Sequence, residues 1–308
     1  MQQKNIPYYS LNQYLREKYG EKVYKLALNG GMTCPNRDGK IDTRGCLFCS
    51  AGGSGDFAED VACDEAIELA KKRLSAKQTG NKFIAYFQAY TNTYASVDYL
   101  RNLYMPIIQR EDIVGLSIGT RPDCLSEDIL DLLEELNQIK PVWVELGLQT
   151  IHPQTAKLIR RGYELPCFEK AVKSLHEREI DVITHLILGL PGESKEDMLA
   201  SVQYLNTQNI QGVKFQLLHV LKNTDLAQLY QEGNFKTLSM EEYIDILMDA
   251  IACLSPDIVI HRLTGDGPKN LLIAPKWSEN KKYVLNSINQ ELQKRNITQG
   301  CKIEKESR

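Results

Sequence analysis

The sequence has no long apolar run. Residues 1–22 (MQQKNIPYYSLNQYLREKYGEK) contain no stretch like the core of a signal peptide, and no later segment reaches the roughly 18 apolar residues of a membrane-spanning helix. We therefore expect no membrane contact and a cytoplasmic location, where cysteines stay reduced. A hydrophobic content of 43% and a charged content of 25% are ordinary for a globular protein, and 308 residues suffice for one large domain with an appendage.

The cysteines lack the paired pattern of a zinc ribbon. Three of the eight, Cys34, Cys46 and Cys49, lie in the segment TCPNRDGKIDTRGCLFCSAG (33–52) with the spacing C-x11-C-x2-C, and there is no second C-x2-C. A structural zinc site normally has four protein ligands, and a disulfide needs two cysteines. Three thiolates can instead hold a 4Fe–4S cluster whose remaining iron stays open to an exogenous ligand. The spacing favours a cluster, and reduced loop cysteines without a metal are the alternative.

The sequence also lacks a strong net charge, but its charges are unevenly spread. The formal net charge is −3, yet residues 1–49 carry 8 basic against 4 acidic residues and residues 265–308 carry 9 against 5, which leaves −11 for residues 50–264. If the two ends meet in space, they form a basic face that suits a polyanion, because phosphate contacts supply sequence-independent affinity. Solvated surface with a frayed tail is the alternative.

Short apolar runs rich in β-branched residues alternate with amphipathic stretches along the chain. The predicted strands are 23–29, 82–88, 113–120, 142–149, 182–190 and 213–220, with a late seventh at 257–264. The predicted helices are 64–77, 98–110, 126–139, 167–179, 194–206, 239–254 and 280–296. Near-continuously apolar strands spaced by about 30 residues, without hairpin signals between them, indicate consecutive parallel βα units.

Six or more such units predict an α/β fold with a partial (β/α)6 TIM-type barrel, and a doubly wound open sheet is the alternative. We expect an N-terminal extension over 1–22, a core barrel over 23–225, and a C-terminal α/β extension over 226–308 with the seventh strand and a basic helix. Two helix starts carry the S/T-x-x-D/E signal that satisfies free backbone N–H groups, namely Ser194 with Asp197 and Ser239 with Glu242.

The cysteine segment follows the first predicted strand and is therefore the first βα loop. In a barrel this loop lies at the C-terminal rim of the strands, where active sites are built. Its several glycines make it bendable enough to bring three sulfurs around one point. The next cysteine, Cys63, lies at or just before the first helix and is predicted to be a packing residue.

These motifs carry a resemblance. The loop from Cys34 to Cys49, with Phe48 before the last cysteine, resembles the cluster loop of the radical S-adenosylmethionine (SAM) superfamily, with a widened first spacing. Later segments resemble, in order, motifs of the group that contains the Elongator catalytic subunit and oxygen-independent coproporphyrinogen oxidase: GTRPDCL (119–125), VELGLQT (144–150), LIRRGY (158–163) and HLILGLPGES (185–194). The likeness runs from about residue 20 to 225 and implies a partial barrel of the radical SAM type.

The resemblance implies a role for the open iron. The three cysteines would hold the cluster, and SAM would chelate the fourth iron through its amino and carboxylate groups. One-electron reduction would then split the sulfonium to methionine and a 5′-deoxyadenosyl radical, which abstracts hydrogen from the substrate.

The resemblance also assigns residues to SAM. It implies that Phe48 packs near the adenine and that Gly189, in a Gly-rich turn, lets the backbone approach the same ring. It implies that Gln149 and Arg161 contact the SAM ribose and carboxylate, and Arg offers a bidentate fork for a carboxylate. The alternatives are an aromatic plug for Phe48 and a solvated helix end for Arg160 and Arg161.

The sequence departs from the superfamily pattern after the second strand. A Gly-Gly-acidic motif for the SAM amino group is usual there, but this chain has FQAYTNTYA (87–95). Gln88, Thr91 and Asn92 are the candidate acceptors in that segment, and we assign Gln88 and Thr91 to cofactor binding.

Charged residues on buried strands complete the candidate site. If Glu145 faces the barrel interior it needs a cationic partner, for which we predict Arg121, a residue that we also assign to cofactor binding. His185, inside an apolar strand, is predicted to be a satisfied core histidine rather than a catalytic one. Arg262 and Asp266, at the end of the seventh strand, are the predicted catalytic residues in contact with substrate.

A basic, aromatic-bearing segment surrounds that pair and contains Lys269, Lys276, Trp277, Lys281 and Lys282. Its composition suits stacking a base while holding phosphates. A C-terminal cap on the barrel is the alternative.

Three segments resemble more closely a small bacterial radical SAM family linked to maturation of the tRNA wobble uridine: FQAYTNTYA, GLQTIHPQTAKLIRRGY (147–163) and HRLTGDGPKNLLIAPKW (261–277). The resemblance implies that a carboxymethylaminomethyl group on the uridine is trimmed to aminomethyl before a separate tRNA methyltransferase acts. It implies tRNA as a partner and an electron donor such as flavodoxin or ferredoxin. The alternatives are radical chemistry on a small metabolite or porphyrin, and a non-catalytic metal-binding scaffold.

Overall fold

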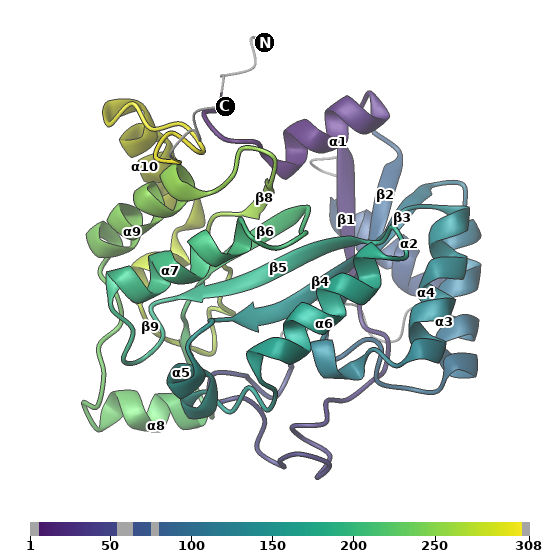
Figure 1. The fold of residues 1–308 in the computed structure, drawn as a ribbon, viewed down its shortest axis with the longest axis horizontal. Helices are drawn as coiled ribbons and strands as arrows, with labels where there is room; N and C mark the ends of the chain where they lie inside the picture. Colours follow the sequence, from purple (N-terminus) through teal and green to yellow (C-terminus); the bar gives the residue numbers. More distant parts are fainter. Residues whose placement is uncertain (1–5, 54–63, 75–79, 304–308) are drawn as a thin grey trace.

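A computed structural model of the chain describes residues 6–53, 64–74 and 80–303. Within them, seven parallel strands form one curved sheet in the order β1-β2-β3-β4-β5-β6-β8 (Figure 1). The strands are β1 (Val23–Leu28), β2 (Lys82–Phe87), β3 (Ile113–Thr120), β4 (Val142–Gln149), β5 (Asp181–Leu188), β6 (Gly212–Leu217) and β8 (Val259–Arg262). The spatial order follows the chain order without reversal, which confirms the partial barrel and not the doubly wound sheet.

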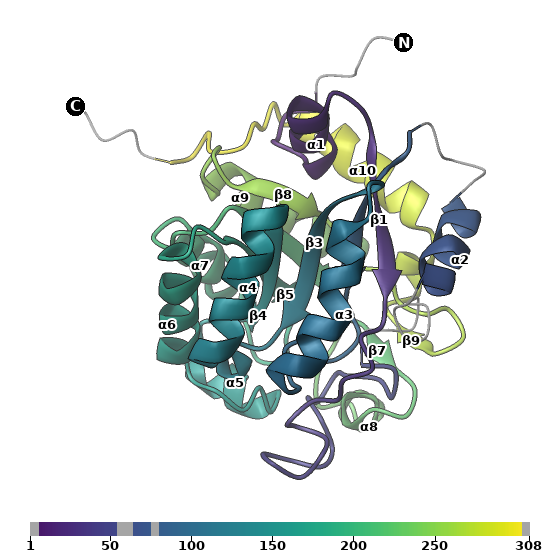
Figure 2. The same cartoon turned by 90° about the vertical axis from the view of Figure 1, so that its right-hand side faces the viewer.

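Helices cover the outer face of the sheet, as Figures 1 and 2 show. They are α2 (Asp64–Leu74), α3 (Val97–Gln109), α4 (Glu127–Ile139), α6 (Leu165–His176), α7 (Lys195–Leu205) and α9 (Met240–Cys253). Both predicted helix starts form complete capping boxes, at Ser194 with Asp197 and at Ser239 with Glu242. Short helices α5 (Pro153–Leu158) and α8 (Asp225–Gln231) lie at the barrel end that carries the cysteine loop, and the 3-10 turn η2 (Pro122–Cys124) follows β3.

Helix α1 (Leu11–Tyr19) closes the opposite end of the barrel. Ser10 caps its first turn by accepting a hydrogen bond from the Gln13 N–H, and Gly20 ends it in a left-handed conformation (φ 73°). Leu15 is buried in a cluster with apolar side chains from the starts of the strands, among them Trp143 and Ile183. The segment predicted only as an extension is therefore a plug, and Figure 1 shows it at the far end from α5 and α8.

The C-terminal part adds strands and a turn that are too short to show a pattern of alternating side chains in the sequence. Strands β7 (Val220–Leu221) and β9 (Leu272–Ala274) pair antiparallel, a 3-10 turn η3 (Lys276–Glu279) follows, and α10 (Lys281–Lys294) ends the fold. None of the described helices is long and apolar enough to cross a membrane.

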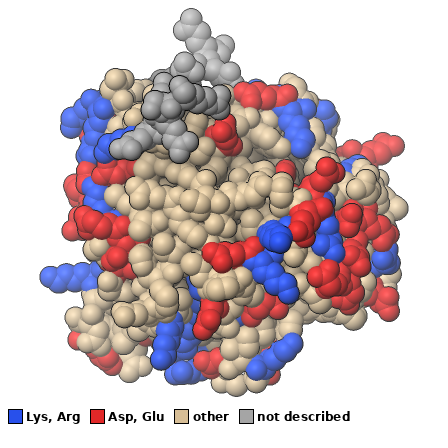
Figure 3. All heavy atoms as spheres, in the orientation of Figure 1, with Lys and Arg blue, Asp and Glu red and all other residues tan. Residues whose placement is uncertain are grey.

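The two ends of the chain meet in space. The backbone N–H of Gln299 donates to Pro7 O at 2.9 Å, and its side-chain oxygen accepts from the Tyr9 N–H at 2.9 Å. However, basic residues near the C-terminus are ion-paired: Arg295 contacts Asp245 at 2.6 Å. Figure 3 shows acidic and basic side chains interspersed on one face. The basic excess of the ends therefore does not make a single-sign surface on that face.

Candidate functional site

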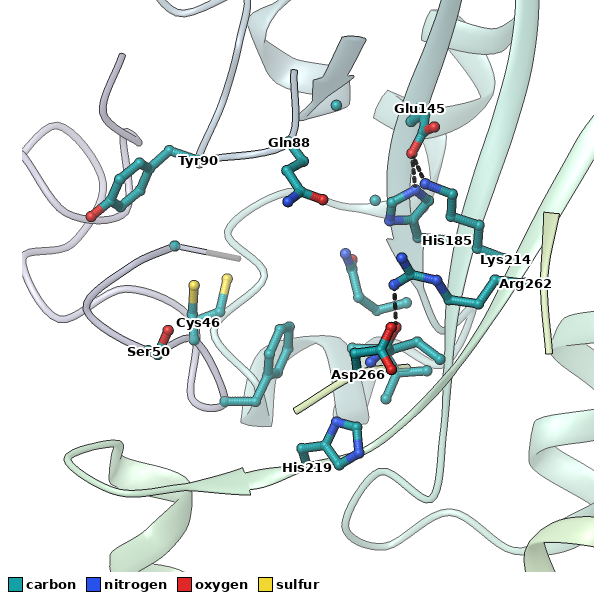
Figure 4. Close-up of a pocket in the computed structure, with 18 of the residues that line it drawn as sticks. Cys46, Ser50, Gln88, Tyr90, Glu145, His185, Lys214, His219, Arg262 and Asp266 are labelled. Atoms are coloured by element: carbon teal, nitrogen blue, oxygen red, sulfur yellow. Dashed lines mark hydrogen bonds and ion pairs between the residues drawn. The ribbon is translucent and has the colours of Figure 1, made fainter. Parts of the chain in front are cut away.

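A cavity of about 820 Å³ lies inside the barrel (Figure 4). The cysteine loop forms one end of it, and inward-facing strand residues form its walls. Among the described residues that line it, cationic side chains greatly outnumber acidic ones: Lys25, Arg37, Arg121, Arg161, Lys214, Arg262 and Lys281 stand against Glu145 and Asp266. The cavity is therefore an electropositive chamber within a chain of net negative charge.

Cys34, Cys46 and Cys49 all line this cavity. The Cys49 N–H donates to Cys46 O at 3.0 Å, which closes a tight turn between two of the sulfurs. The Arg37 guanidinium fixes that turn from behind, donating to Cys49 O at 2.9 Å and to Ser50 O at 2.6 Å. We call Arg37 and the three cysteines the cysteine end. Cys63, predicted as a packing residue, lies outside the described residues.

A glycine lets Arg37 approach the loop. Gly45, directly before Cys46, has a φ of 78°, and a Cβ there would lie 3.0 Å from the Arg37 guanidinium carbon. Both the left-handed backbone and the close approach favour glycine. The position of Arg37 against the loop therefore depends on Gly45.

The cysteine end fits a cluster by the chemistry of its donors. Burial raises the pKa of the Cys46 thiol to about 12, so a thiolate there needs a cation, which a metal supplies. The Asn36 amide donates to Cys46 Sγ at 3.4 Å, the kind of sulfur hydrogen bond that tunes iron–sulfur groups. Among the described residues no three Cys, His, Asp or Glu side chains converge as one metal ion requires. Cys34, Cys46 and Cys49 would each hold a different iron of a 4Fe–4S cluster, which does not require all three sulfurs around a single ion.

Most of the predicted cofactor residues lie around this cavity. The lining includes Phe48, Gln88, Thr91, Arg121, Gln149 and Arg161. Gly189 and Asn92 are not part of it. The Gly189 N–H donates to Met198 Sδ at 3.1 Å, and a Cβ on Gly189 would lie 3.0 Å from Leu238 Cδ1, so this glycine packs closely behind the wall. The SAM contacts themselves stay predictions.

Arg161 is a buried structural arginine. It is 3% exposed and donates to Leu148 O at 2.9 Å and to Thr150 O at 2.7 Å, which fixes the end of β4 beside Gln149. Gln149 has a φ of 60°, an uncommon conformation for a side-chain-bearing residue. The solvated helix end that we held as the alternative is therefore wrong for Arg161.

The predicted partner of Glu145 is wrong. Arg121 forms a bidentate pair with Asp123 at 2.8 and 2.7 Å, because it follows the end of β3 whereas Glu145 lies in the middle of β4. Glu145 is 1% exposed and is held instead by Lys25, at 2.8 Å, and by Lys214. The alternation of side chains along β4 points it into the barrel, deeper than Arg121.

These lysines belong to a layer of charged and polar side chains across the barrel. The Lys214 ammonium donates to Tyr86 OH at 3.0 Å, and His185 Nε2 lies 2.7 Å from Glu145 Oε2. We call Lys25, Tyr86, Glu145, His185 and Lys214 the charged layer; each comes from a different strand and each lines the cavity. Figure 4 shows His185 and Lys214 directed at Glu145.

The pKa directions in the layer follow from one carboxylate facing two ammonium groups. Burial opposes ionisation of Glu145, but Lys214 and Lys25 outweigh it and hold the pKa of this carboxyl well below its usual value. Burial, with Lys25 beside it, lowers the pKa of Lys214 despite the attraction of Glu145. Burial, together with Lys214, lowers the pKa of His185 to about 4, so it stays neutral at pH 7.

His185 was predicted as a satisfied core histidine, and its partner Glu145 does satisfy it. It nevertheless lines the cavity with a side chain 30% exposed, so it is not enclosed in an apolar core. Sequence reasoning missed His219, which is 7% exposed and lines the cavity with no hydrogen-bond partner at Nε2 among the described residues. It follows β6 closely, but a single histidine carries no sequence signal.

Arg262 and Asp266, the predicted catalytic residues, both line the cavity. Arg262 donates to the Gln216 side-chain oxygen at 3.2 Å, and Asp266 forms an ion pair with Lys281. Gly265 lies between them, and a Cβ there would collide with the Gln216 amide, so glycine is required for this packing. The structure thus brings both residues to the wall, and their catalytic role stays a prediction.

Trp277, predicted to stack a base, is a packing residue. Its indole N–H donates to Leu238 O at 3.0 Å, and its ring lies 5.7 Å from that of Tyr243. Lys276 is paired with Glu279 at 2.9 Å, whereas Lys281 reaches the cavity wall. The capping alternative therefore holds for Trp277.

Comparison with known proteins shows which protein family the chain matches. Residues 42–205 match the model described as the radical SAM superfamily, and residues 210–294 match the radical SAM C-terminal domain. The uncharacterized protein YtqA of Bacillus subtilis (strain 168) is 45% identical over 295 residues, which cover 95% of this chain and 92% of YtqA. The tRNA uridine(34) acetyltransferase of Methanocaldococcus infernus is 29% identical over 167 residues, covering 52% of this chain and 30% of that protein.

A solved structure has a similar fold. The archaeal Elp3 of Methanocaldococcus infernus, with an N-terminal deletion, superposes with a TM-score of 0.68 at 19% identity. The match covers 90% of this chain and 64% of that one, so the chain spans slightly less than two thirds of the Elp3 chain.

Proposed function

The chain belongs to the radical SAM superfamily, whose members are enzymes that use a 4Fe–4S cluster and SAM, and from that premise we propose that its substrate is tRNA. The proposed reaction trims the carboxymethylaminomethyl side chain of the wobble uridine to aminomethyl. Because the chain is a radical SAM enzyme, the non-catalytic scaffold is set aside.

The electropositive cavity carries this proposal. Its volume of about 820 Å³ must hold the cluster and SAM as well as the substrate, so it suits one nucleoside splayed out of a loop and not a duplex. Cationic lining favours a substrate with an anionic group, such as the carboxylate on this uridine side chain, over a neutral metabolite. The name of the Methanocaldococcus relative places its own action at uridine 34, which supports the same nucleoside for this chain.

Each region of the cavity has a part in the proposal. Cys34, Cys46 and Cys49 would hold the cluster, with Arg37 keeping their turn in place. Phe48 and Gln149 would position SAM, joined by Gln88, Thr91, Arg121 and Arg161 from the same lining. When bound, these groups supply a 5′-deoxyadenosyl radical, and cleavage of one SAM to methionine and 5′-deoxyadenosine takes up two electrons.

The electrons of the proposed reaction balance with one SAM as the oxidant and water as the only other co-reactant. Oxidation of the secondary amine to an imine at the carboxymethyl carbon releases two electrons and two protons. Hydrolysis of the imine then leaves the aminomethyl group on the uridine and releases the two-carbon unit as an aldehyde acid. The two electrons match those taken up by the cleavage of one SAM, so no further oxidant is needed.

The proposal implies two protein partners. A one-electron donor such as flavodoxin or ferredoxin would reduce the cluster to start the reaction. A tRNA methyltransferase would consume the product, because a primary amine is the acceptor that an N-methylation needs.

Mass spectrometry of tRNA nucleosides from a strain that lacks this protein tests the proposal. We expect carboxymethylaminomethyl-uridine to accumulate and the aminomethyl products to disappear. Plasmid-borne wild type should restore them, whereas Cys46→Ala should not. An unchanged nucleoside profile would contradict the tRNA substrate and redirect the search to a small metabolite or porphyrin.

A further inference from the structure

The charged layer has more positive than negative charge. Among the described residues, Glu145 is the carboxylate shared by Lys25 and Lys214, and Arg262, the register neighbour of Lys214 on the adjacent strand, donates only to the Gln216 side-chain oxygen. Asp266 does not correct the excess, because it is paired with Lys281. Buried charges are normally matched, since an unpaired ion loses its hydration without compensation. Arg262, partly buried at the cavity wall, has no carboxylate partner among the described residues, and Lys25 and Lys214 share a single one.

The charged layer also lies deeper in the barrel than the cysteine end. Lys25 precedes the last residue of β1 by three positions, and Lys214 precedes the last residue of β6 by three. At about 3.3 Å per residue, the layer lies roughly 10 Å below the strand ends where the cysteine loop starts. A ligand that fills the cavity can therefore have one part beside the cluster and another in the charged layer.

We propose that the charged layer together with Arg262 is a carboxylate-binding subsite, and that it receives the carboxylate of the substrate's side chain. The inference rests on the proposed function and adds how the substrate is selected. A terminal carboxylate can enter a layer in which Lys214 is only 4% exposed, whereas a backbone phosphodiester, joined to the chain on both sides, cannot. An incoming carboxylate would meet Arg262 first, because Arg262 is more accessible than Lys214, and would give Lys214 a second negative partner beside Glu145.

Two sources of a carboxylate are available, the substrate and the methionine part of SAM, and the test separates them. Two anticodon stem-loop RNAs are made, one with carboxymethylaminomethyl-uridine and one in which a primary amide of nearly the same shape replaces the carboxylate and removes its negative charge. Binding of each to the cluster-loaded full chain with SAM is measured by fluorescence anisotropy. The variants are Arg262→Gln and Lys214→Met. The control is Lys173→Met, on α6 and 77% exposed.

We expect wild type and Lys173→Met to bind the acid RNA about tenfold or more tightly than the amide, as for a hydrogen-bonded charge pair. Arg262→Gln and Lys214→Met should reduce that preference to less than about twofold, while SAM affinity in equilibrium dialysis is unchanged. If Lys214→Met does not fold, Arg262→Gln alone decides. Loss of SAM affinity in the variants would assign the subsite to SAM and overturn the substrate assignment.

The two proposals fail in different ways. If the wild-type enzyme converts the acid RNA to aminomethyl-uridine but binds acid and amide equally, the subsite is wrong and the proposed function stands. If wild type binds the acid RNA preferentially but forms no aminomethyl-uridine, the subsite stands and the proposed reaction is wrong.

Discussion

The cysteine end takes its sulfurs from one loop, Cys34 to Cys49, whereas the charged layer takes one side chain from each of five strands. The loop lies on the rim of the barrel, where Arg37 holds its turn and hydrogen bonds from Asn36 to Arg160 O and from the Leu47 N–H to Ile159 O tie it to the end of α5. The layer lies within the barrel, where Glu145 and Lys214 are almost completely buried. The first region can thus be disabled without unfolding the barrel, while the second couples function to stability. The predictions test that difference.

The largest expected effect is the loss of activity in Cys46→Ala. Removing one ligand should abolish the cluster and lower SAM cleavage by more than the roughly 100-fold that loss of an outer-shell partner can cost. The free energy of unfolding of the metal-free protein should fall by about 1 kcal/mol or less, because Cys46 has a small side chain in a loop outside the barrel core. Iron and sulfide analysis measures the cluster, 5′-deoxyadenosine formation measures SAM cleavage, and urea unfolding measures stability. A variant that still binds iron and cleaves SAM would overturn the ligand assignment.

Glu145→Gln should have the reverse profile, with its largest effect on stability. The change leaves the buried Lys214 and the partly buried Lys25 without their counterion, and breaking a buried pair in this way costs about 3–5 kcal/mol. Urea unfolding of the metal-free protein beside wild type and Lys173→Met measures it. A loss under about 1 kcal/mol, no larger than for an exposed ion pair, would mean that the layer does not couple charge to stability as argued.

His185→Asn should give a smaller effect, visible only as pH falls. Because burial lowers the pKa of His185 to about 4, the unfolded chain takes up a proton near pH 6.5 that the folded protein does not. The contribution of neutral His185 to the free energy of unfolding is fully present above pH 6.5. It is lost as the pH falls toward 4, by at most about 1.4 kcal/mol per pH unit.

Unfolding at pH 7.5, 6.0 and 5.0 should therefore show wild type losing stability more steeply than the Asn variant. His219, whose pKa burial also lowers to about 4, is present in both proteins and cancels from the difference. If stability falls equally with pH in wild type and in the Asn variant, the pKa of His185 is the same in the folded and the unfolded chain.

The sequence predicts the cysteine end much better than the charged layer. The cysteine ligands are close in sequence, so their spacing alone indicates a cluster, and buried parallel strands show as apolar runs. Glu145 and its partners are 120 and 69 residues apart, and only the curvature of the sheet brings them together. Arg121 was the wrong partner for Glu145. It lies in the GTRPDCL motif just past the end of β3, whereas the lysines that pair with Glu145 lie within β1 and β6. Strands β7 and β9 are too short to show a period.

One measurement tests most directly whether the two regions serve one reaction. Cluster-loaded protein is incubated anaerobically with SAM, a reductant and tRNA that carries carboxymethylaminomethyl-uridine, and 5′-deoxyadenosine and modified nucleosides are quantified together. The account predicts one aminomethyl-uridine for each 5′-deoxyadenosine. Formation of 5′-deoxyadenosine with an unchanged nucleoside profile would contradict it.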